Sequence, residues 1–183
     1  AKRGVKTSTV VWSYANIAVS LSLVVFCVIL GPWGMKKIGI LGFPMLCYVV
    51  LMISQRAATM VLTITENMMR ADIADYELDR SGNFMPGLVG ACYTFIEKTV
   101  ASLGSVLTTV AVAFIGYTAA APQMGDKITV GLFFVTIGLM YGVPIIGWIC
   151  NIIAMKFYEL DKDRMVEIQT NIAEKKKALK PQK

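Results

Sequence analysis

Long apolar blocks alternate with short polar segments along nearly the whole chain. The first block, from Val10 to Leu30, holds no charged residue and ends at the turn signal Gly31-Pro32-Trp33-Gly34. A helix needs about 20 mainly apolar residues to cross the hydrocarbon core of a bilayer. The pattern therefore predicts an all-α integral membrane protein with about five transmembrane helices. These helices are expected over residues 10–31, 38–54, 57–76, 87–120 and 128–157.

The boundary between the second and third blocks is the least defined, because only Ser54, Gln55 and Arg56 separate two apolar runs. Three arrangements fit this segment. The two blocks form separate spans joined by a very tight turn, or Ile38 to Ala74 is one long helix, or a loop is missing near Arg56. In the last block, Pro144 predicts a kink.

Composition excludes several classes of protein. The 183 residues are 56% hydrophobic and only 16% charged, whereas a soluble domain is nearer a quarter charged. Histidine is absent, and the four cysteines lie inside apolar blocks without metal-ligand spacing. No nucleophile–base pair or phosphate-binding glycine loop is visible, so we expect neither an enzyme nor a bound cofactor. The basic residues flank apolar blocks, which disfavours a nucleic-acid partner.

The distribution of charge predicts the orientation in the membrane. Eight of the 18 Lys and Arg residues follow Met155, which indicates a cytoplasmic C-terminus by the positive-inside rule. Five spans then place residues 1–9 in an external loop, and four spans place them inside. Lys2, Arg3 and Lys6 favour the inside, whereas Lys36-Lys37 favours five spans.

The C-terminal residues 159–183 have a different pattern. Met165, Ile168 and Ile172 recur at helical spacing among charged residues, and a basic tail follows. This pattern predicts a cytoplasmic amphipathic helix, either lying on the membrane surface or fully solvated.

Charged side chains inside the apolar blocks are candidates for function, because each costs about 2.5–3.5 kcal/mol to insert at the centre of a bilayer. Lys98 is the strongest candidate, since it lies near the middle of its expected span. Its neighbour Glu97 points about 100° away, so the two are not expected to pair. A bridge from Glu66 to Lys98 across neighbouring helices is allowed, with a structural ion pair as the alternative role. Tyr93 offers a surface for a sugar or for packing.

Carboxylates also gather where the third span ends. Asp72 and Asp75 are three residues apart, so they share a helix face. They suit a cation, a proton, or gate salt bridges with Arg70 or Arg80, and by spacing alone they also suit ordinary charge at a membrane boundary.

The segment Arg70-Ala-Asp-Ile-Ala-Asp-Tyr76 resembles the Ala-Asp-x-x-Asp-Tyr motif of the glycoside–pentoside–hexuronide:cation symporters, the melibiose-permease family of the major facilitator superfamily. In that family the motif closes the tenth transmembrane helix. Gly87 matches the glycine that opens helix eleven, and Lys98 matches an intramembrane lysine. The likeness extends from Met68 to Ala178 and implies the C-terminal part of a major-facilitator bundle, entered near helix eight with five spans.

The resemblance also implies a function and residue roles. The chain would be the C-terminal portion of a cation-coupled sugar symporter of the bacterial inner membrane, coupled to Na⁺ or H⁺ and inactive by itself. Lys98, with Glu97, Glu66 and Tyr93, would link sugar and cation. Asp72, Asp75, Tyr76 and Arg80 would form a cytoplasmic gate. The partners would be the lipid bilayer, a missing N-terminal half and a sugar. A small accessory membrane subunit that docks onto a larger assembly is the alternative.

Overall fold

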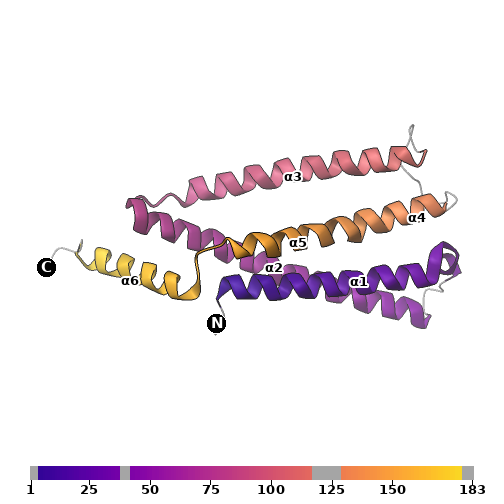
Figure 1. Cartoon of the computed structure of the whole chain (residues 1–183), viewed down its shortest axis with the longest axis horizontal. Helices are drawn as coiled ribbons and strands as arrows, with labels where there is room; N and C mark the ends of the chain where they lie inside the picture. The colour runs from indigo at the N-terminus through magenta and orange to yellow at the C-terminus, as the bar shows by residue number, and fades with distance from the viewer. Residues whose placement is uncertain (1–3, 38–41, 117–128, 179–183) are drawn as a thin grey trace.

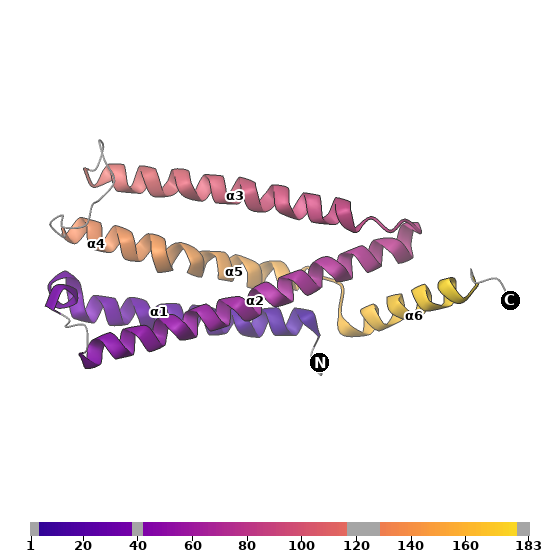
Figure 2. The same ribbon diagram turned by 180° about the vertical axis from the view of Figure 1, so that it is seen from behind.

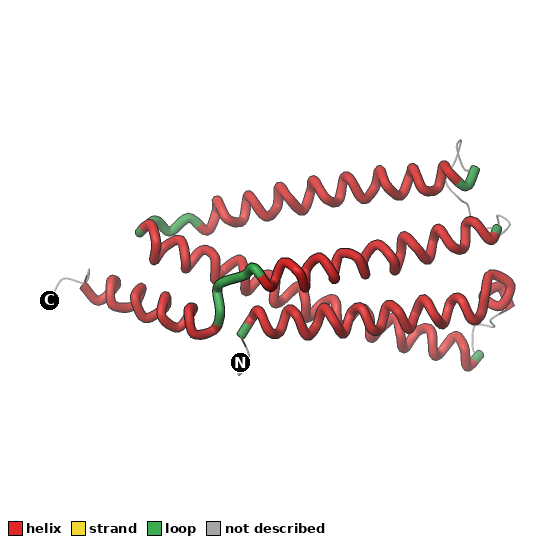
Figure 3. Tube along the Cα trace, viewed as in Figure 1, coloured by secondary structure: helices red, strands yellow, loops and turns green. Residues whose placement is uncertain are grey.

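The computed structural model describes residues 4–37, 42–116 and 129–178 of the chain, and the described part consists of helices joined by short connections (Figure 3). Four helical segments are long and apolar enough to cross a membrane, and a shorter amphipathic helix follows them. The elements are α1 (Val5–Lys37), α2 (Phe43–Ser81), α3 (Pro86–Phe114), α4 (Val130–Ile137), the π-helical segment η1 (Gly138–Gly142), α5 (Val143–Lys156) and α6 (Lys162–Ala178).

The helix α1 packs against both α2 and α5, whereas α3 lies at one edge of the bundle (Figures 1 and 2). A hydrophobic cluster of Leu23, Cys27, Ile137 and Tyr141 joins α1 to the segment formed by α4 and η1. The N-terminus and α6 lie at the same end of the bundle in both views. Four candidate spans in the described residues are compatible with the start of α1 and with α6 on one side of the membrane, and the side on which residues 1–9 lie stays a prediction.

The separate spans expected over 38–54 and 57–76 are one continuous helix, α2, of 39 residues. Ser54-Gln55-Arg56 contains no Gly or Pro, and the Ser54 hydroxyl donates to the Val50 carbonyl one turn earlier. Gln55 and Thr59 both donate to Asn16 of α1, so the polar interruption is a helix contact and not a turn. The separation of residues 38–54 from 57–76 is therefore wrong, and the described residues hold four candidate spans where about five were expected. The start near helix eight stays a prediction.

A helix of 39 residues is about 58 Å long, well beyond the roughly 30 Å of a bilayer core. The C-terminal part of α2 therefore has length to spare beyond the apolar region, and it is there that α6 packs. Gly82 ends α2 in the left-handed conformation, with φ at 76°, and its N–H caps the Leu78 carbonyl.

At the expected kink before Pro144, the helix contains a π-helical segment, whose turn is wider than that of an α-helix. Proline removes one backbone donor and its ring crowds the carbonyl four residues earlier. The π-helical segment η1 precedes Pro144 directly, and α4, η1 and α5 form one continuous helical path from Val130 to Lys156. The span expected over 87–120 ends at Phe114 as a helix, and the expected loop around Pro122 lies outside the described residues.

Candidate functional site

The buried face of α1 is polar. Thr9, Ser13, Asn16 and Ser20 repeat every three or four residues, and each has 0% of its surface exposed. Asn16 accepts hydrogen bonds from Thr59 at 3.0 Å and from Gln55 at 3.3 Å, both on α2. Small residues allow helices to approach closely, and polar side chains bond across the contact. This face therefore joins α1 to α2.

The same face reaches α5 as well. The amide of Asn151 donates to the Ser13 hydroxyl at 3.2 Å, and α1 lies against α5 along this side. Asn16 also donates to the Trp12 carbonyl of its own helix at 2.8 Å, which fixes the orientation of its side chain. Ser13 and Asn16 of α1 thus help to hold the bundle together, whereas the buried Ser20 hydroxyl has no hydrogen-bond partner among the described residues.

Lys98 lies on a polar stripe of α3 that no described helix covers. The stripe is Lys98, Ser102, Ser105 and Thr109, all exposed, at the spacing of one helix face. The three hydroxyls donate to carbonyls of α3 itself, at 2.8–3.0 Å. No side chain of α3 is buried. The stripe is therefore available to whatever packs on, or moves past, this face.

The bridge that forms between α2 and α3 is not the expected Glu66–Lys98 pair. Arg70 of α2 binds the Glu97 carboxylate at 2.5 Å, and its guanidinium lies 4.7 Å from the centre of the Tyr93 ring. Tyr93 and Glu97 are four residues apart, so one face of α3 presents both to Arg70. Because Glu97 and Lys98 point in different directions, engaging Glu97 turns Lys98 away from α2. The structure therefore brings Arg70, Glu97 and Tyr93 together and leaves Lys98 apart.

Glu66 is exposed and lies four residues before Arg70 on α2. Both Arg70 and Glu97 are close enough to act on its carboxylate electrostatically. Two carboxylates therefore lie near one guanidinium between α2 and α3, and among the described residues only Glu97 forms a salt bridge with Arg70.

The expected gate motif lies where α2 meets α6 and the connection between α5 and α6. Asp72 and Asp75 are half-buried on α2, and Tyr76 packs against a cluster of Met165, Ile168 and Ile172 from α6. Arg80 is exposed, and none of the salt bridges of the described residues includes it. The expected gate pairs of Asp72 or Asp75 with Arg70 or Arg80 are thus not formed in this structure.

A different ion pair closes this end of the bundle. Lys175 of α6 contacts the Asp79 carboxylate at 2.7 Å and donates to the Asp79 carbonyl at 2.7 Å. Asn171 donates to the other carboxylate oxygen at 3.3 Å. A lysine at the C-terminal end of a helix also interacts favourably with the helix dipole. The amphipathic helix, expected either on the membrane surface or fully solvated, is therefore docked on the end of α2.

Tyr158 connects this end to the N-terminus. Its carbonyl accepts a hydrogen bond from Lys6 at 2.6 Å. Its hydroxyl is buried without a partner among the described residues. Burial, together with the nearby Asp72 carboxylate, raises the pKa of Tyr158 to about 12, so the phenol stays neutral at physiological pH. Segments from both ends of the chain thus meet the motif at Asp72.

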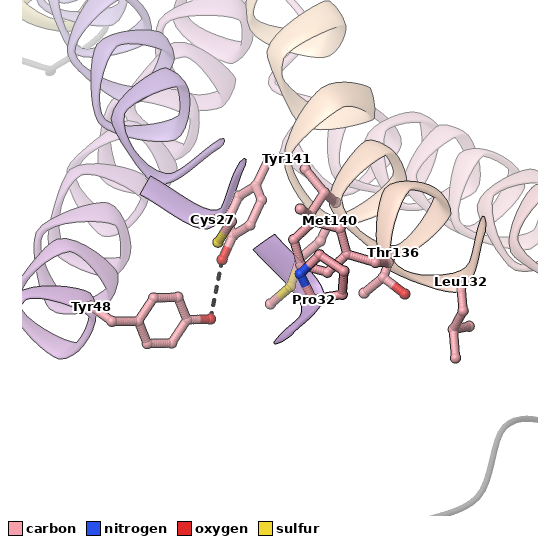
Figure 4. A pocket seen from close by; sticks show the side chains of 9 residues that line it. Cys27, Pro32, Tyr48, Leu132, Thr136, Met140 and Tyr141 are labelled. Atoms are coloured by element: carbon pink, nitrogen blue, oxygen red, sulfur yellow. Dashed lines mark hydrogen bonds between the residues drawn. The ribbon is translucent and has the colours of Figure 1, made fainter. Parts of the chain in front are cut away.

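An apolar pocket of about 270 Å³ lies toward the opposite end of the bundle, between α1, α2 and the segment of α4 and η1. Figure 4 shows Tyr48 and Tyr141 facing each other at its edge, with their hydroxyl oxygens 3.3 Å apart. Cys27, Pro32 and Met140 line it. The pocket can accommodate apolar groups, but its lining has few polar atoms that could orient a sugar.

Residues 1–162 match the family model for MFS/sugar transport proteins. The chain belongs to this family of major-facilitator sugar transport proteins. No curated protein and no solved structure matched the chain. Four apolar spans in a member of this family identify an integral membrane protein, with part of a major-facilitator helical bundle.

In this transporter, sequence patterns alone missed two features. Arg70 stood out only as a partner for Asp72 or Asp75, although a cation inside an apolar helix is itself a signal for an intramembrane acid. The pairing of Asp79 with Lys175 joins residues 96 positions apart, and no local pattern indicates such a contact.

Proposed function

We propose that this chain is the C-terminal portion of a cation-coupled sugar symporter that works by alternating access. Its substrates would be glycosides, pentosides or hexuronides, and the coupling ion would be Na⁺ or H⁺. Family membership supports sugar transport, and the resemblance around Asp72 and Lys98 supports the melibiose-permease type. In such proteins two helical halves rock around a site near the middle of the membrane.

The observation that carries the proposal is the position of Lys98. It is the thirteenth residue of α3, about 18 Å from the start of a 29-residue helix. A lysine held near mid-span and left uncovered by the rest of the bundle lacks a structural role within the described residues. Lys98 would sense substrate or coupling ion at the face where the other half of the transporter packs.

The C-terminal end of α2 would have a different role from Lys98, that of a gate. Asp72, Asp75 and Tyr76 lie where α6 and the N-terminal segment converge, and Arg80 is free to reach a partner outside the described residues. These side chains would open and close the cytoplasmic side. The basic residues after Met155 support a cytoplasmic C-terminus, and we place the protein in the bacterial inner membrane.

The described helices cannot enclose a central site, because α3 has no buried side chain. The remaining helices would come from another segment or chain, which fits the two-halves architecture of these transporters. We therefore expect membrane vesicles that contain only these 183 residues to show no coupled sugar uptake. Robust cation-driven uptake by such vesicles would contradict the proposal.

The decisive experiment compares Lys98→Met with Lys156→Met in the intact transporter, reconstituted in vesicles with a sodium or proton gradient. Lys156 ends α5 and is exposed, so it provides the same substitution away from the proposed site. We expect Lys98→Met to abolish gradient-driven accumulation of sugar while folding normally, and Lys156→Met to transport like the wild type.

An accessory subunit would behave differently. A docking role should tolerate Lys98→Met, because removing an uncovered charge from an apolar helix stabilises it. Unchanged transport by the larger assembly that carries Lys98→Met would favour the accessory role over the symporter.

A further inference from the structure

A second pocket, of about 250 Å³, lies between α2 and the segment formed by η1 and α5. It adjoins the pocket of Figure 4, since Met140 and Tyr141 line both. Unlike that pocket, it contains a charge. Arg56 and Gln55 of α2 face Trp148 of α5 across it. The π-helical segment forms one wall, and such segments occur frequently at functional sites.

Arg56 has no acidic partner among the described residues, where the salt bridges join Arg70–Glu97, Arg164–Glu167 and Lys175–Asp79. Arg56 belongs to the candidate span α2, where its exposed side chain lines the pocket, and its guanidinium is always charged. Five N–H donors in a planar fork match the two oxygens of a carboxylate. The pocket therefore has a site for an anionic group.

Gln55 supplies the complementary acceptor. Its amide nitrogen donates to Asn16 at 3.3 Å, which fixes the side chain against α1. Its other amide atom, the oxygen Oε1, is buried and has no hydrogen-bond donor in the part of the chain that the structure describes. A buried acceptor of this kind is costly unless a ligand or water supplies a donor. A ligand hydroxyl beside the guanidinium meets that need.

Trp148 adds an apolar surface, because the half-buried indole lines the same pocket. Sugar rings pack their C–H faces against aromatic rings, and their hydroxyls donate to amide oxygens. A volume of about 250 Å³ is slightly below the range typical of pockets for drug-sized ligands, so it suits a single ring and not an oligosaccharide.

We propose that this pocket binds a sugar acid, with the carboxylate on Arg56, a hydroxyl on Gln55 and the ring against Trp148. The proposal rests on the proposed transport function and deepens it, since it narrows the substrate to a monosaccharide that carries a carboxylate. Arg56 would then determine specificity by its charge, and Lys98 on α3 would remain a separate residue of the transport mechanism.

The test is calorimetric binding to the intact transporter in detergent, with D-glucuronate and D-glucuronamide as matched probes. The two differ only in the charged group. We expect glucuronate to bind at least tenfold more tightly than the amide in the wild type. Arg56→Gln should remove this difference, and Arg56→Lys should restore part of it. Arg164→Gln, on the exposed surface of α6, should leave both affinities unchanged.

Equal affinity of the wild type for the two probes would overturn the proposal, and this comparison needs no variant that has to fold. Loss of the folded protein in Arg56→Gln, together with equal wild-type affinities, would show that Arg56 instead pairs with a carboxylate elsewhere in the protein. Transport of a neutral sugar with no preference for the acid would sink this inference alone, whereas transport of no sugar would also sink the proposed function.

Discussion

The helices α1 and α3 carry the same kind of polar stripe and use it in opposite ways. In α1, Thr9, Ser13, Asn16 and Ser20 are fully buried, and partners on α2 and α5 hold Ser13 and Asn16. In α3, Lys98, Ser102, Ser105 and Thr109 are exposed, and the hydroxyls bond only within their own helix.

The difference shows that the role of a polar face in an apolar helix depends on which helices pack against it. Hydroxyl and amide groups in α1 replace apolar contacts at helix crossings, where small side chains permit close approach. Those of α3 remain outside the packed part of the described bundle, and the lysine of that stripe, Lys98, lies near the middle of its span. The polar stripe of α1 contributes to helix packing, and we expect the polar stripe of α3 to contribute to transport.

The largest effect should come from one substitution made on both stripes. We expect Ser13→Leu to destabilise the intact protein by about 2–4 kcal/mol, because leucine overpacks a closed contact and Asn151 loses its acceptor. Ser102→Leu should leave stability nearly unchanged and reduce transport. Thermal unfolding in detergent and uptake in vesicles measure both. Equal destabilisation by the two variants would break the comparison.

A smaller effect should come from the hydrogen bonds of Asn16. Asn16→Ala removes the shared acceptor of Gln55 and Thr59, and we expect a loss of about 1–2 kcal/mol. A double-mutant cycle with Thr59→Ala should give a coupling energy of about 0.6 kcal/mol, the average for helix–helix hydrogen bonds in membranes, and not more than about 1.7 kcal/mol. Additive effects would mean that the bond between Asn16 and Thr59 contributes nothing.

The contact that holds α3 to α2 should be weaker still. Arg70 and Glu97 are 27% and 56% exposed, so we expect their coupling to be about 1 kcal/mol or less. A double-mutant cycle with Arg70→Gln and Glu97→Gln, measured by thermal unfolding, gives this value. A coupling as large as that of Asn16 would show that α3 is anchored as firmly as α1.

The smallest effect at neutral pH concerns Tyr158. Burial raises its pKa from 10.0 to about 12, so the unfolded chain loses this proton first as pH rises. The contribution of Tyr158 to stability should therefore be present below pH 10 and decline between about pH 10 and 12. Tyr158→Phe should lack this decline, and below pH 10 it should be as stable as wild type, since the lost hydroxyl has no partner. Identical unfolding profiles for the two proteins above pH 10 would contradict this assignment.

Much of the architecture is predictable from the chain. Apolar blocks locate α1, α3 and the last span, because only a helix satisfies its own backbone inside a bilayer. The spacing of Met165, Ile168 and Ile172 predicts α6, and the expected helix exists. The continuity of α2 was one of three open arrangements, since polar residues in mid-helix resemble a turn until Asn16 is found opposite them.

The candidate site divides in the same way. Residue type and depth in the span single out Lys98, Glu97, Glu66 and Tyr93, because charged and aromatic residues inside an apolar block can be recognised from the sequence alone. Their partners are not visible. The choice of Arg70–Glu97 over Glu66–Lys98 depends on how α3 is rotated against α2, and a rotation of about 100° exchanges one neighbour for the other.

The sequence by itself determined that this chain is helical and membrane-spanning, and it located the motif at Asp72 and the lysine at 98. The tertiary structure decided that four candidate spans exist in the described residues, and that the start of α1 meets the segment after α5 at Tyr158. It also decided that the exposed Arg56 lines a pocket without an acidic partner among the described residues. Hydropathy is a property of each segment by itself, so it can be read directly from the order of the residues. Pairing and burial are properties of two segments at once, and only their packing fixes them.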